Sequence, residues 1–114
     1  DSNARHAAFI SGDIDIMFSS VDLYAQEAAL QIKGKIILVT DLSMGGDGIV
    51  ALDEIKTVSD LRGKTVAFNR GGPSDYLLYK ALADNGVSIN EIKQMEVDDP
   101  SKAGDAFLGG SVDA

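Results

Sequence analysis

Helical and strand-like spacings of apolar residues alternate along the whole chain. Apolar positions one turn apart, as in Leu77, Leu78, Ala81 and Leu82, predict helices. Short alternating or continuous apolar runs predict strands, and a continuous run is typical of a strand covered on both faces. The predicted helices span 3–11, 21–31, 75–85 and 100–108, with a single helical turn at 58–62. The predicted strands span 14–18, 35–40, 49–52, 64–69 and 94–97.

This order of elements predicts an α/β fold with a mostly parallel sheet flanked by helices. Local signals support the helix boundaries. Ser88 and Glu91 have the spacing of a capping box, and Asp99 followed by Pro100 has the pattern of a cap with proline at the first helical position. Glycines follow most of the predicted helices, as expected where a helix ends.

A short repeat connects the two ends of the chain. Residues 8–16 resemble residues 106–114: Ala, Phe, Gly and Asp are identical, and two further positions are conservative. Both copies fall where a predicted helix ends and a predicted strand begins. One interpretation is a chance likeness between helix–glycine–strand junctions. The other is a pair of related α/β lobes, with the chain starting late in one lobe and ending at the matching point of the other.

Composition narrows the classes of function. The 114 residues suit one ordinary domain, and 45% are hydrophobic, enough for a core. A net charge of −8 repels phosphate backbones, so no nucleic-acid partner is expected. The absence of cysteine excludes disulfides and cysteine-ligated metals, and the single His6 cannot build a multi-histidine site. We therefore expect no metal and no cofactor. Because the chain starts without Met and stops abruptly after Ala114, we expect a fragment.

Enzyme and metal signatures fail on their spacing. Gly63-Lys64-Thr65 lacks the earlier glycine of a phosphate-binding loop, because Val58 stands there. The segment 41–52 has the oxygen spacing of a calcium loop but ends in Leu52 where Glu is required. No paired carboxylates suggest acid–base catalysis, so we expect no catalytic residues.

Three junctions remain as candidate binding segments. The glycine-rich segment 41–48, which contains Asp47, is either a flexible connection or a hinge lining a cleft. The segment 71–74 joins a predicted strand to a predicted helix, where open α/β sheets bind ligands and the helix N-terminus favours an anion. Its alternative is a plain turn with Ser74 as helix cap. Ser19 and Ser20 occupy a similar junction, with simple capping as the alternative.

At these residues the chain resembles a known family. The matching stretches are 12–20, 41–51, 55–67, 71–78 and 106–114. They resemble the substrate-binding proteins of ABC importers of the nitrate/sulfonate/bicarbonate type, including the thiamine-precursor-like branch. The resemblance covers nearly the whole chain and implies a type II periplasmic-binding fold, in which two α/β lobes hold a ligand between them.

The resemblance also implies a division of the chain. Residues 1–40 would form the last part of lobe one, 41–48 the crossing or hinge segment, and 49–114 most of lobe two. The implied ligand-binding residues are Ser19 and Ser20 on lobe one, Asp47 near the hinge, and Gly72, Pro73 and Ser74 on lobe two.

The implied function is transport without catalysis. The protein would capture a small oxyanion, sulfonate or heterocycle by lobe closure and deliver it to ABC permease subunits, in the periplasm or anchored outside the cell as a lipoprotein. Two alternatives stay open: an enzyme of the thiamine-pyrimidine-synthase-like branch, and the ligand-sensing effector domain of a regulator. The chain alone is expected to bind no solute measurably and to associate through unpaired strand edges.

Overall fold

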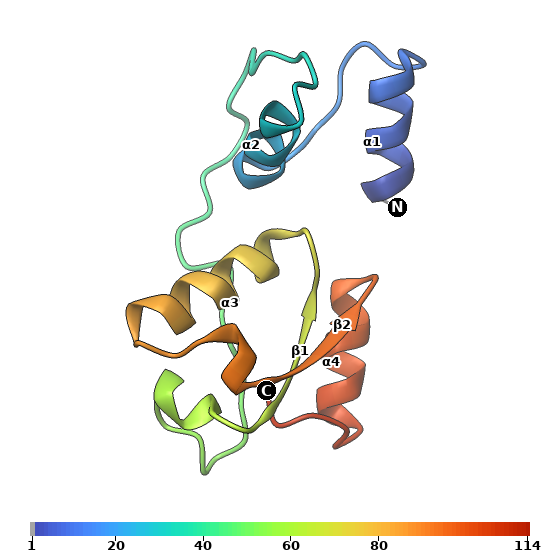
Figure 1. Cartoon of the computed structure of the whole chain (residues 1–114). Coiled ribbons are helices and arrows are strands. Elements are labelled where there is room, and N and C mark those ends of the chain that lie inside the picture. Colours follow the sequence, from blue (N-terminus) through green and yellow to red (C-terminus); the bar gives the residue numbers. More distant parts are fainter. Residues whose placement is uncertain (1) are drawn as a thin grey trace. The chain divides into compact units, whose positions relative to one another are not determined.

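The computed structural model describes the backbone of residues 2–114 and the side chains from Ala4 onward. It divides into two compact units, unit 1 (Asp1–Thr40) and unit 2 (Asp41–Ala114). Figure 1 shows the elements of each unit.

Unit 1 consists of two helices and extended segments. Helix α1 spans Ser2–Ser11 and helix α2 spans Val21–Ala29. The predicted end of the first helix is confirmed, because Gly12 has φ +83°, a conformation that favours glycine. The second helix ends two residues before the predicted position, since Gln31 has φ +62° and leaves the helical region.

The predictions of strands at 14–18 and 35–40 are wrong: neither segment is a strand in the structure. Ile37 and Leu38 are 74% and 72% exposed. A strand exists only when a neighbouring strand satisfies its backbone groups, and within residues 2–40 no segment pairs with either run. The apolar residues of these two runs therefore belong to no sheet within the described part of unit 1.

Unit 2 is an α/β unit. Its elements are the short 3₁₀ helix η1 (Val58–Leu61), strand β1 (Thr65–Asn69), helix α3 (Pro73–Asp84), the 3₁₀ helix η2 (Ile89–Glu91), strand β2 (Lys93–Val97) and helix α4 (Pro100–Leu108). Strands β1 and β2 are parallel, with Thr65 opposite Lys93 and Asn69 opposite Val97. The predicted α/β class with a parallel sheet is confirmed.

Side-chain caps explain where several of these elements begin. The Asp99 carboxylate accepts a hydrogen bond from the Ser101 N–H at 2.8 Å and so caps α4. The predicted capping box is confirmed at η2, where the Ser88 N–H donates to Glu91 Oε2 at 2.7 Å. A second box of the same type, Thr57 with Asp60, opens η1 and was not predicted.

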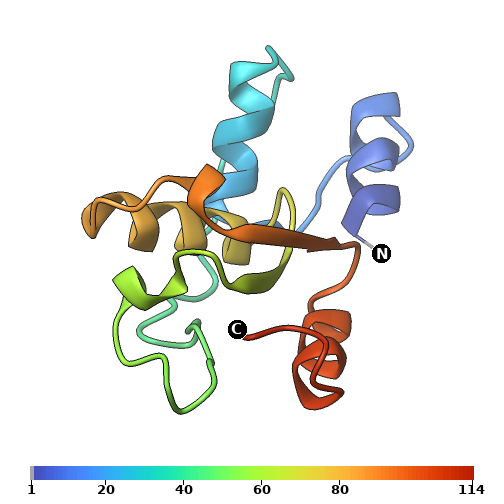
Figure 2. The ribbon, with the colours of Figure 1, turned by 60° about the horizontal axis from the view of Figure 1, so that its bottom comes forward.

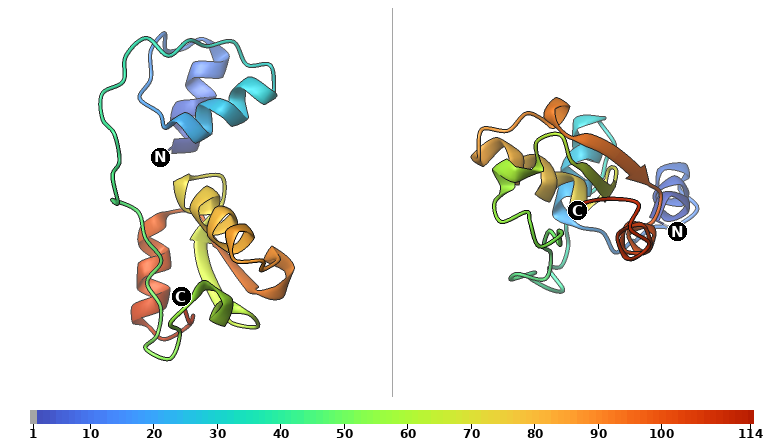
Figure 3. Two further views of the ribbon diagram at one scale, coloured as in Figure 1. Left: turned by 90° about the vertical axis from the view of Figure 1, so that its left-hand side faces the viewer. Right: turned by 90° about the horizontal axis from the view of Figure 1, so that it is seen from below.

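The core of unit 2 lies between β1 and α3. Val66 and Phe68 are 2% and 3% exposed, and they pack with Leu78 and Leu82 of α3. Helix α4 packs against β1 and β2 from the other side, as the left view of Figure 3 shows. The two crossover helices thus cover opposite faces of the sheet, and this holds β1 in the middle of the unit.

The last residues of the chain run beside the second edge of β1. The Asp113 N–H donates to the Thr65 carbonyl at 2.8 Å, and the Ala67 N–H donates to the Ala114 carbonyl at 2.9 Å. Figure 2 shows the C-terminus beside the strands. The prediction of a strand at 49–52 is wrong, because this segment has one such bond, from the Leu52 N–H to the Asp113 carbonyl at 3.0 Å.

The sequence repeat is also a structural repeat. In the second copy the Gly110 N–H donates to the Phe107 carbonyl at 3.0 Å and the Ser111 N–H donates to the Ala106 carbonyl at 2.9 Å. The equivalent residues of 8–13 form the same two bonds, at 3.2 and 2.9 Å. Both glycines have positive φ. Each unit therefore ends one helix in the same way and directs the chain into an extended segment.

Candidate functional site

The junction between β1 and α3 brings three of the sequence-predicted residues together. Gly71 has φ +76°, Gly72 occupies the N-cap position, and Pro73 is the first helical residue. Proline fits there because its missing N–H would have no helical partner. The helix starts two residues earlier than predicted. Ser74 is therefore inside the first turn, and the interpretation of Ser74 as the N-cap is wrong.

Gly72 is buried because the neighbouring Asn69 side chain lies against it. A Cβ atom at Gly72 would come within 2.6 Å of Asn69 Oδ1. The Asn69 side chain is itself held, since its Nδ2 donates to the Val97 carbonyl at 2.9 Å. Gly72 is thus required by close packing inside the protein, independently of any ligand. Asn69 was not among the predicted site residues, although a polar residue at the end of an apolar strand was a usable signal.

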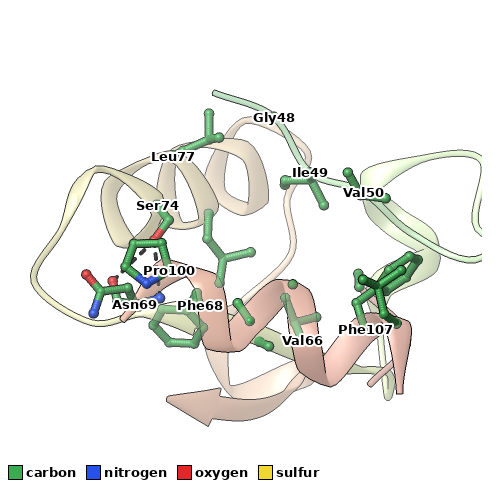
Figure 4. Close-up of a pocket in the computed structure, with 16 residues that line it drawn as sticks. Gly48, Ile49, Val50, Val66, Phe68, Asn69, Ser74, Leu77, Pro100 and Phe107 are labelled. Carbon is green, nitrogen blue, oxygen red and sulfur yellow. Dashed lines mark hydrogen bonds between the residues drawn. The ribbon is translucent and has the colours of Figure 1, made fainter. Parts of the chain in front are cut away.

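The Ser74 hydroxyl is turned toward the end of β1. It accepts a hydrogen bond from the Asn69 N–H at 3.2 Å and donates to the Asn69 carbonyl at 3.3 Å. Both bonds are drawn in Figure 4. The hydroxyl therefore satisfies the backbone N–H and carbonyl groups at the end of β1. A solute that bound to this hydroxyl would have to replace these hydrogen bonds.

Asp75 adds a negative charge to the same helix turn. Its Oδ2 accepts a hydrogen bond from the Gly71 N–H at 2.8 Å. Its Oδ1 is buried and has no hydrogen-bond partner within the described residues. A carboxylate at this place is favoured by the partial positive charge of the helix N-terminus. It also occupies a donor that a bound anion would use.

The remaining backbone donors of the loop are mostly paired. The Gly72 N–H donates to Asn69, and the N–H groups of Asp75 and Tyr76 both donate to the Gly72 carbonyl. In the segment 71–76, within the part of the chain that the structure describes, the Ser74 N–H alone among the available donors has no partner. Fewer donors are free here than the small residues of the loop had suggested.

Arg70 is the cation next to the loop, and it is neutralised. Its guanidinium donates to Glu96 Oε1 at 2.5 Å and to Gln94 Oε1 at 3.3 Å, and it lies over the Phe68 ring. The hydrogen bond to Glu96 raises the pKa of Arg70 above its ordinary value. Because both partners of this ion pair are about half exposed, the pair adds little stability. The arginine remains accessible at the rim of the loop.

The other predicted site residues lie elsewhere. Asp47 is exposed and accepts a hydrogen bond from the Ser43 hydroxyl at 3.4 Å. Ser19 is exposed, and Ser20 occupies the N-cap position of α2, where its hydroxyl is buried but makes no capping hydrogen bond. Ser19 and Ser20 belong to unit 1.

A cavity of about 320 Å³ lies beside β1, between α3 and α4 (Figure 4). Leu77 from α3 and Phe107 from α4 line it from two sides, and Ile49 closes a third. Asn69 and Ser74 supply its polar atoms at one end. Asp47 does not line the cavity, although the next residue, Gly48, does.

Among residues 2–114 no group of three or more histidines and carboxylates is arranged to hold a metal ion. Within the same range, every helix is too short or too polar to cross a membrane.

Comparisons with known proteins agree with the parallel α/β architecture of unit 2. The chain is 35% identical over 108 residues to a protein of Escherichia coli (strain K12) named for binding aliphatic sulfonates, covering 91% of this chain and 30% of that protein. The crystal structure of the periplasmic aliphatic sulphonate binding protein SsuA from Escherichia coli matches with 42% identity and a TM-score of 0.52, over 56% of this chain and 22% of the other.

A further structure, the periplasmic sulfonate-binding protein SsuA from Methylobacillus flagellatus KT, matches with 29% identity and a TM-score of 0.50, over 54% of this chain and 18% of the other. The sequence profile of the family described as NMT1/THI5 like matches residues 47–114. The chain belongs to this family, which confirms the resemblance. It spans about 30% of the length of the Escherichia coli relative.

Proposed function

We propose that this chain is part of the solute-binding component of an ABC importer, and that a small oxyanion such as an aliphatic sulfonate binds at the N-terminus of α3. The family match carries this proposal, because residues 47–114 include Asp47 and the whole β1–α3 loop. The names of the relatives supply the class of solute. The proposal includes a location in the periplasm, anchoring to the membrane, and delivery of the solute to permease subunits.

The proposed division of labour follows the family. Residues 1–40 belong to lobe one and contribute Ser19 and Ser20, residues 41–48 form the hinge with Asp47, and residues 49–114 belong to lobe two. On lobe two, the free Ser74 N–H and the positive end of α3 attract the anion. Gly72 and Pro73 shape the loop beside which the anion binds. Closure of the lobes over the solute shifts an open–closed equilibrium and needs no chemical step.

Asp75 sets the charge preference in this proposal. An oxyanion at the α3 N-terminus meets the Asp75 carboxylate, which already holds the Gly71 N–H. We expect Asp75→Asn to bind a sulfonate about two- to fivefold more tightly, because the substitution removes a negative charge that repels the anion. The size of this gain corresponds to the energy of one charge at a helix terminus. A cationic amine should instead bind less tightly to the same variant.

The test uses the protein purified without refolding from its whole reading frame. Native mass spectrometry weighs any solute that co-purifies, and titration calorimetry compares ethanesulfonate with ethylamine, for the wild type and for Asp75→Asn. The proposal predicts binding of ethanesulfonate that strengthens in Asp75→Asn. Preferential binding of ethylamine, weakened by the same substitution, would contradict it, and so would turnover of a bound solute.

A further inference from the structure

The C-terminal end of α3 presents an asparagine directly before a glycine. Asn85 is the C-cap residue, Gly86 follows it with φ +65°, and both are exposed. The other asparagines of the sequence, Asn3, Asn69 and Asn90, precede residues with side chains. Because a glycine has no side chain to hinder the approach, its backbone nitrogen can attack the side-chain amide of a preceding asparagine. This pair therefore carries a covalent reaction that needs no enzyme and no solute.

The reaction is a deamidation through a cyclic imide. The Gly86 nitrogen forms a bond to Asn85 Cγ, and the Cγ–Nδ2 bond breaks. The proton of the Gly86 N–H passes through water to the leaving nitrogen, which departs as ammonia. One water molecule then opens the imide at either of its two carbonyls. Opening at Cγ yields aspartate, and opening at the backbone carbon yields isoaspartate, so a neutral amide becomes a carboxylate without any oxidation or reduction.

The fold holds the attacking nitrogen away from its target. The Gly86 N–H donates to the Ala83 carbonyl at 3.1 Å. The Val87 N–H donates to the Leu82 carbonyl at 2.9 Å, which completes the hydrogen-bond pattern of a Schellman motif. Asn85 has ψ 12°, so the Gly86 nitrogen nearly eclipses the Asn85 nitrogen and does not lie beside the side chain. The ring can close only after a large rotation about the Cα–C bond of Asn85, and this rotation breaks the hydrogen bond of the Gly86 N–H.

Three further contacts hold the same two residues. Asn85 Nδ2, the leaving nitrogen, donates to the Ala81 carbonyl at 2.9 Å. Arg62 Nη2 donates to the Gly86 carbonyl at 2.9 Å. Val87 is 4% exposed and belongs to the core of unit 2, so it anchors the chain directly after Gly86. The reaction in the folded protein therefore requires that the end of α3 opens first.

We propose that Asn85 is a site of spontaneous deamidation, and that opening of the α3 C-terminus sets the rate in the folded protein. The modification does not depend on the proposed solute site at the other end of α3. Its product changes the helix end. A carboxylate at position 85 lies next to Asp84 and the last carbonyls of α3, where the helix dipole disfavours a negative charge. It also cannot donate to the Ala81 carbonyl, so each modified molecule is held less firmly at this end.

Peptide mapping by mass spectrometry tests the proposal on the protein expressed from its whole reading frame. The protein is incubated in mildly alkaline buffer with and without guanidinium chloride. Trypsin cleavage after Lys80 and Lys93 gives one peptide that contains both Asn85 and Asn90, and Asn90 serves as the internal control because Glu91 follows it. We expect Asn85 to react at least about tenfold more slowly in the folded protein than in guanidinium chloride, because a hydrogen-bonded helix end opens rarely.

The outcomes of this mapping decide both parts of the proposal. A reaction at Asn85 in guanidinium chloride no faster than that at Asn90 would overturn the assignment of the site. Equal rates at Asn85 with and without guanidinium chloride would overturn its control by the fold. In guanidinium chloride, Gly86→Ala should slow the reaction, because a methyl group hinders the attacking nitrogen, and an unchanged rate would contradict the imide route.

Two arginine variants separate the end of α3 from the rest of unit 2. Arg62→Ala removes the hydrogen bond to the Gly86 carbonyl and should raise the rate at Asn85 in the folded protein about two- to tenfold. Arg70 is also half-exposed and paired with a glutamate, but its hydrogen bonds go to β2. Arg70→Ala should therefore leave the rate within about twofold of the wild type. An equal increase in the two variants, or no increase in Arg62→Ala, would overturn control by the α3 C-terminus.

Discussion

Both units contain the same helix–glycine junction, but the segment that follows it is hydrogen-bonded to a strand in unit 2 and is not a strand in unit 1. In unit 2, the chain leaves α4 through Gly110 and reaches β1, where Asp113 and Ala114 form parallel hydrogen bonds. In unit 1, the chain leaves α1 through Gly12 in the same geometry, yet Ile14–Ile16 is not a strand. The difference shows that this pattern prepares an extended segment and that a neighbouring strand edge must complete it.

Exposure follows the same division. Val66 and Phe68 of β1 are almost fully buried, whereas Ile37 and Leu38 in the strongest strand pattern of unit 1 are more than 70% exposed. Apolar area removed from water is the main favourable contribution to folding. We therefore expect the stability of the chain to come from unit 2, and each prediction below compares a residue of unit 2 with a matched residue of unit 1 or with the wild type.

The largest effect is expected from truncating the core. Leu82 is 1% exposed, and Leu82→Ala should lower the free energy of unfolding by about 2–5 kcal/mol because it removes packed methyl groups and leaves a cavity. Leu38→Ala, at a residue 72% exposed, should change it by less than about 0.5 kcal/mol. Urea unfolding followed by circular dichroism measures both. Equal costs for the two variants would contradict the comparison.

The second-largest effect is expected from the two aspartates of the repeat, which should differ in their contribution to the free energy of unfolding. Asp113 accepts the N–H that begins β1, so Asp113→Ala leaves a partly buried donor without a partner and should cost about 1–3 kcal/mol. Its counterpart Asp15 is exposed, and Asp15→Ala should stay within about 0.5 kcal/mol of the wild type. The same urea experiment applies. A larger loss for Asp15→Ala would show that the first copy is also paired.

The N-cap residues provide a smaller contrast. Asp99 caps α4 with a side-chain hydrogen bond, and Asp99→Ala should cost about 0.5–2 kcal/mol. Ser20 holds the same position at α2 without such a bond, so Ser20→Ala should have almost no cost. Thermal melting of both variants measures the difference. A loss at Ser20 as large as that at Asp99 would mean that its hydroxyl has a partner.

The smallest effect is a dependence on pH. Hydrogen bonds from Thr57 lower the pKa of Asp60, and the hydrogen bond from Ser101 lowers the pKa of Asp99. A carboxylate with a lowered pKa in the folded state adds stability above its unfolded pKa, near 4, and this stability is lost as pH falls through the folded value. The urea midpoint should therefore drop as the pH falls below about 4. Asp60→Asn should make the drop shallower, and an unchanged pH profile in that variant would refute its role.

Much of the fold was predictable where local signals and tertiary partners agree. Helix α4, with its cap at Asp99 and its end at Gly109, follows the predicted boundaries. Strand β1 also follows its prediction, because Val66 and Phe68 alternate with residues whose side chains face the second helix layer. The strand predictions at 14–18, 35–40 and 49–52 are wrong for one reason. Periodicity reports which side chains seek burial, but the hydrogen-bonding partner of a strand is not encoded in its own residues.

The candidate site was less predictable than the fold. Position alone placed Gly72, Pro73 and Ser74 at a helix N-terminus, as the structure has them. Two side chains depend on rotamers and contacts across the turn: Asp75, which accepts from the Gly71 N–H, and Asn69, which lies against Gly72. For the same reason Gly72, expected to allow the approach of a ligand, proves to be required by the approach of Asn69.

The most direct test of the proposed site is an NMR titration of the ¹⁵N-labelled protein, expressed from its whole reading frame, with ethanesulfonate, and with ethylamine as the control. If the α3 N-terminus holds the solute, the amides of Gly71, Gly72 and Ser74 shift progressively with ethanesulfonate, and this response survives Leu38→Ala. The amides of the loop should respond less to ethylamine at equal concentration. Ethanesulfonate shifts that leave residues 71–76 untouched while other residues of the chain respond would contradict the assignment of the site.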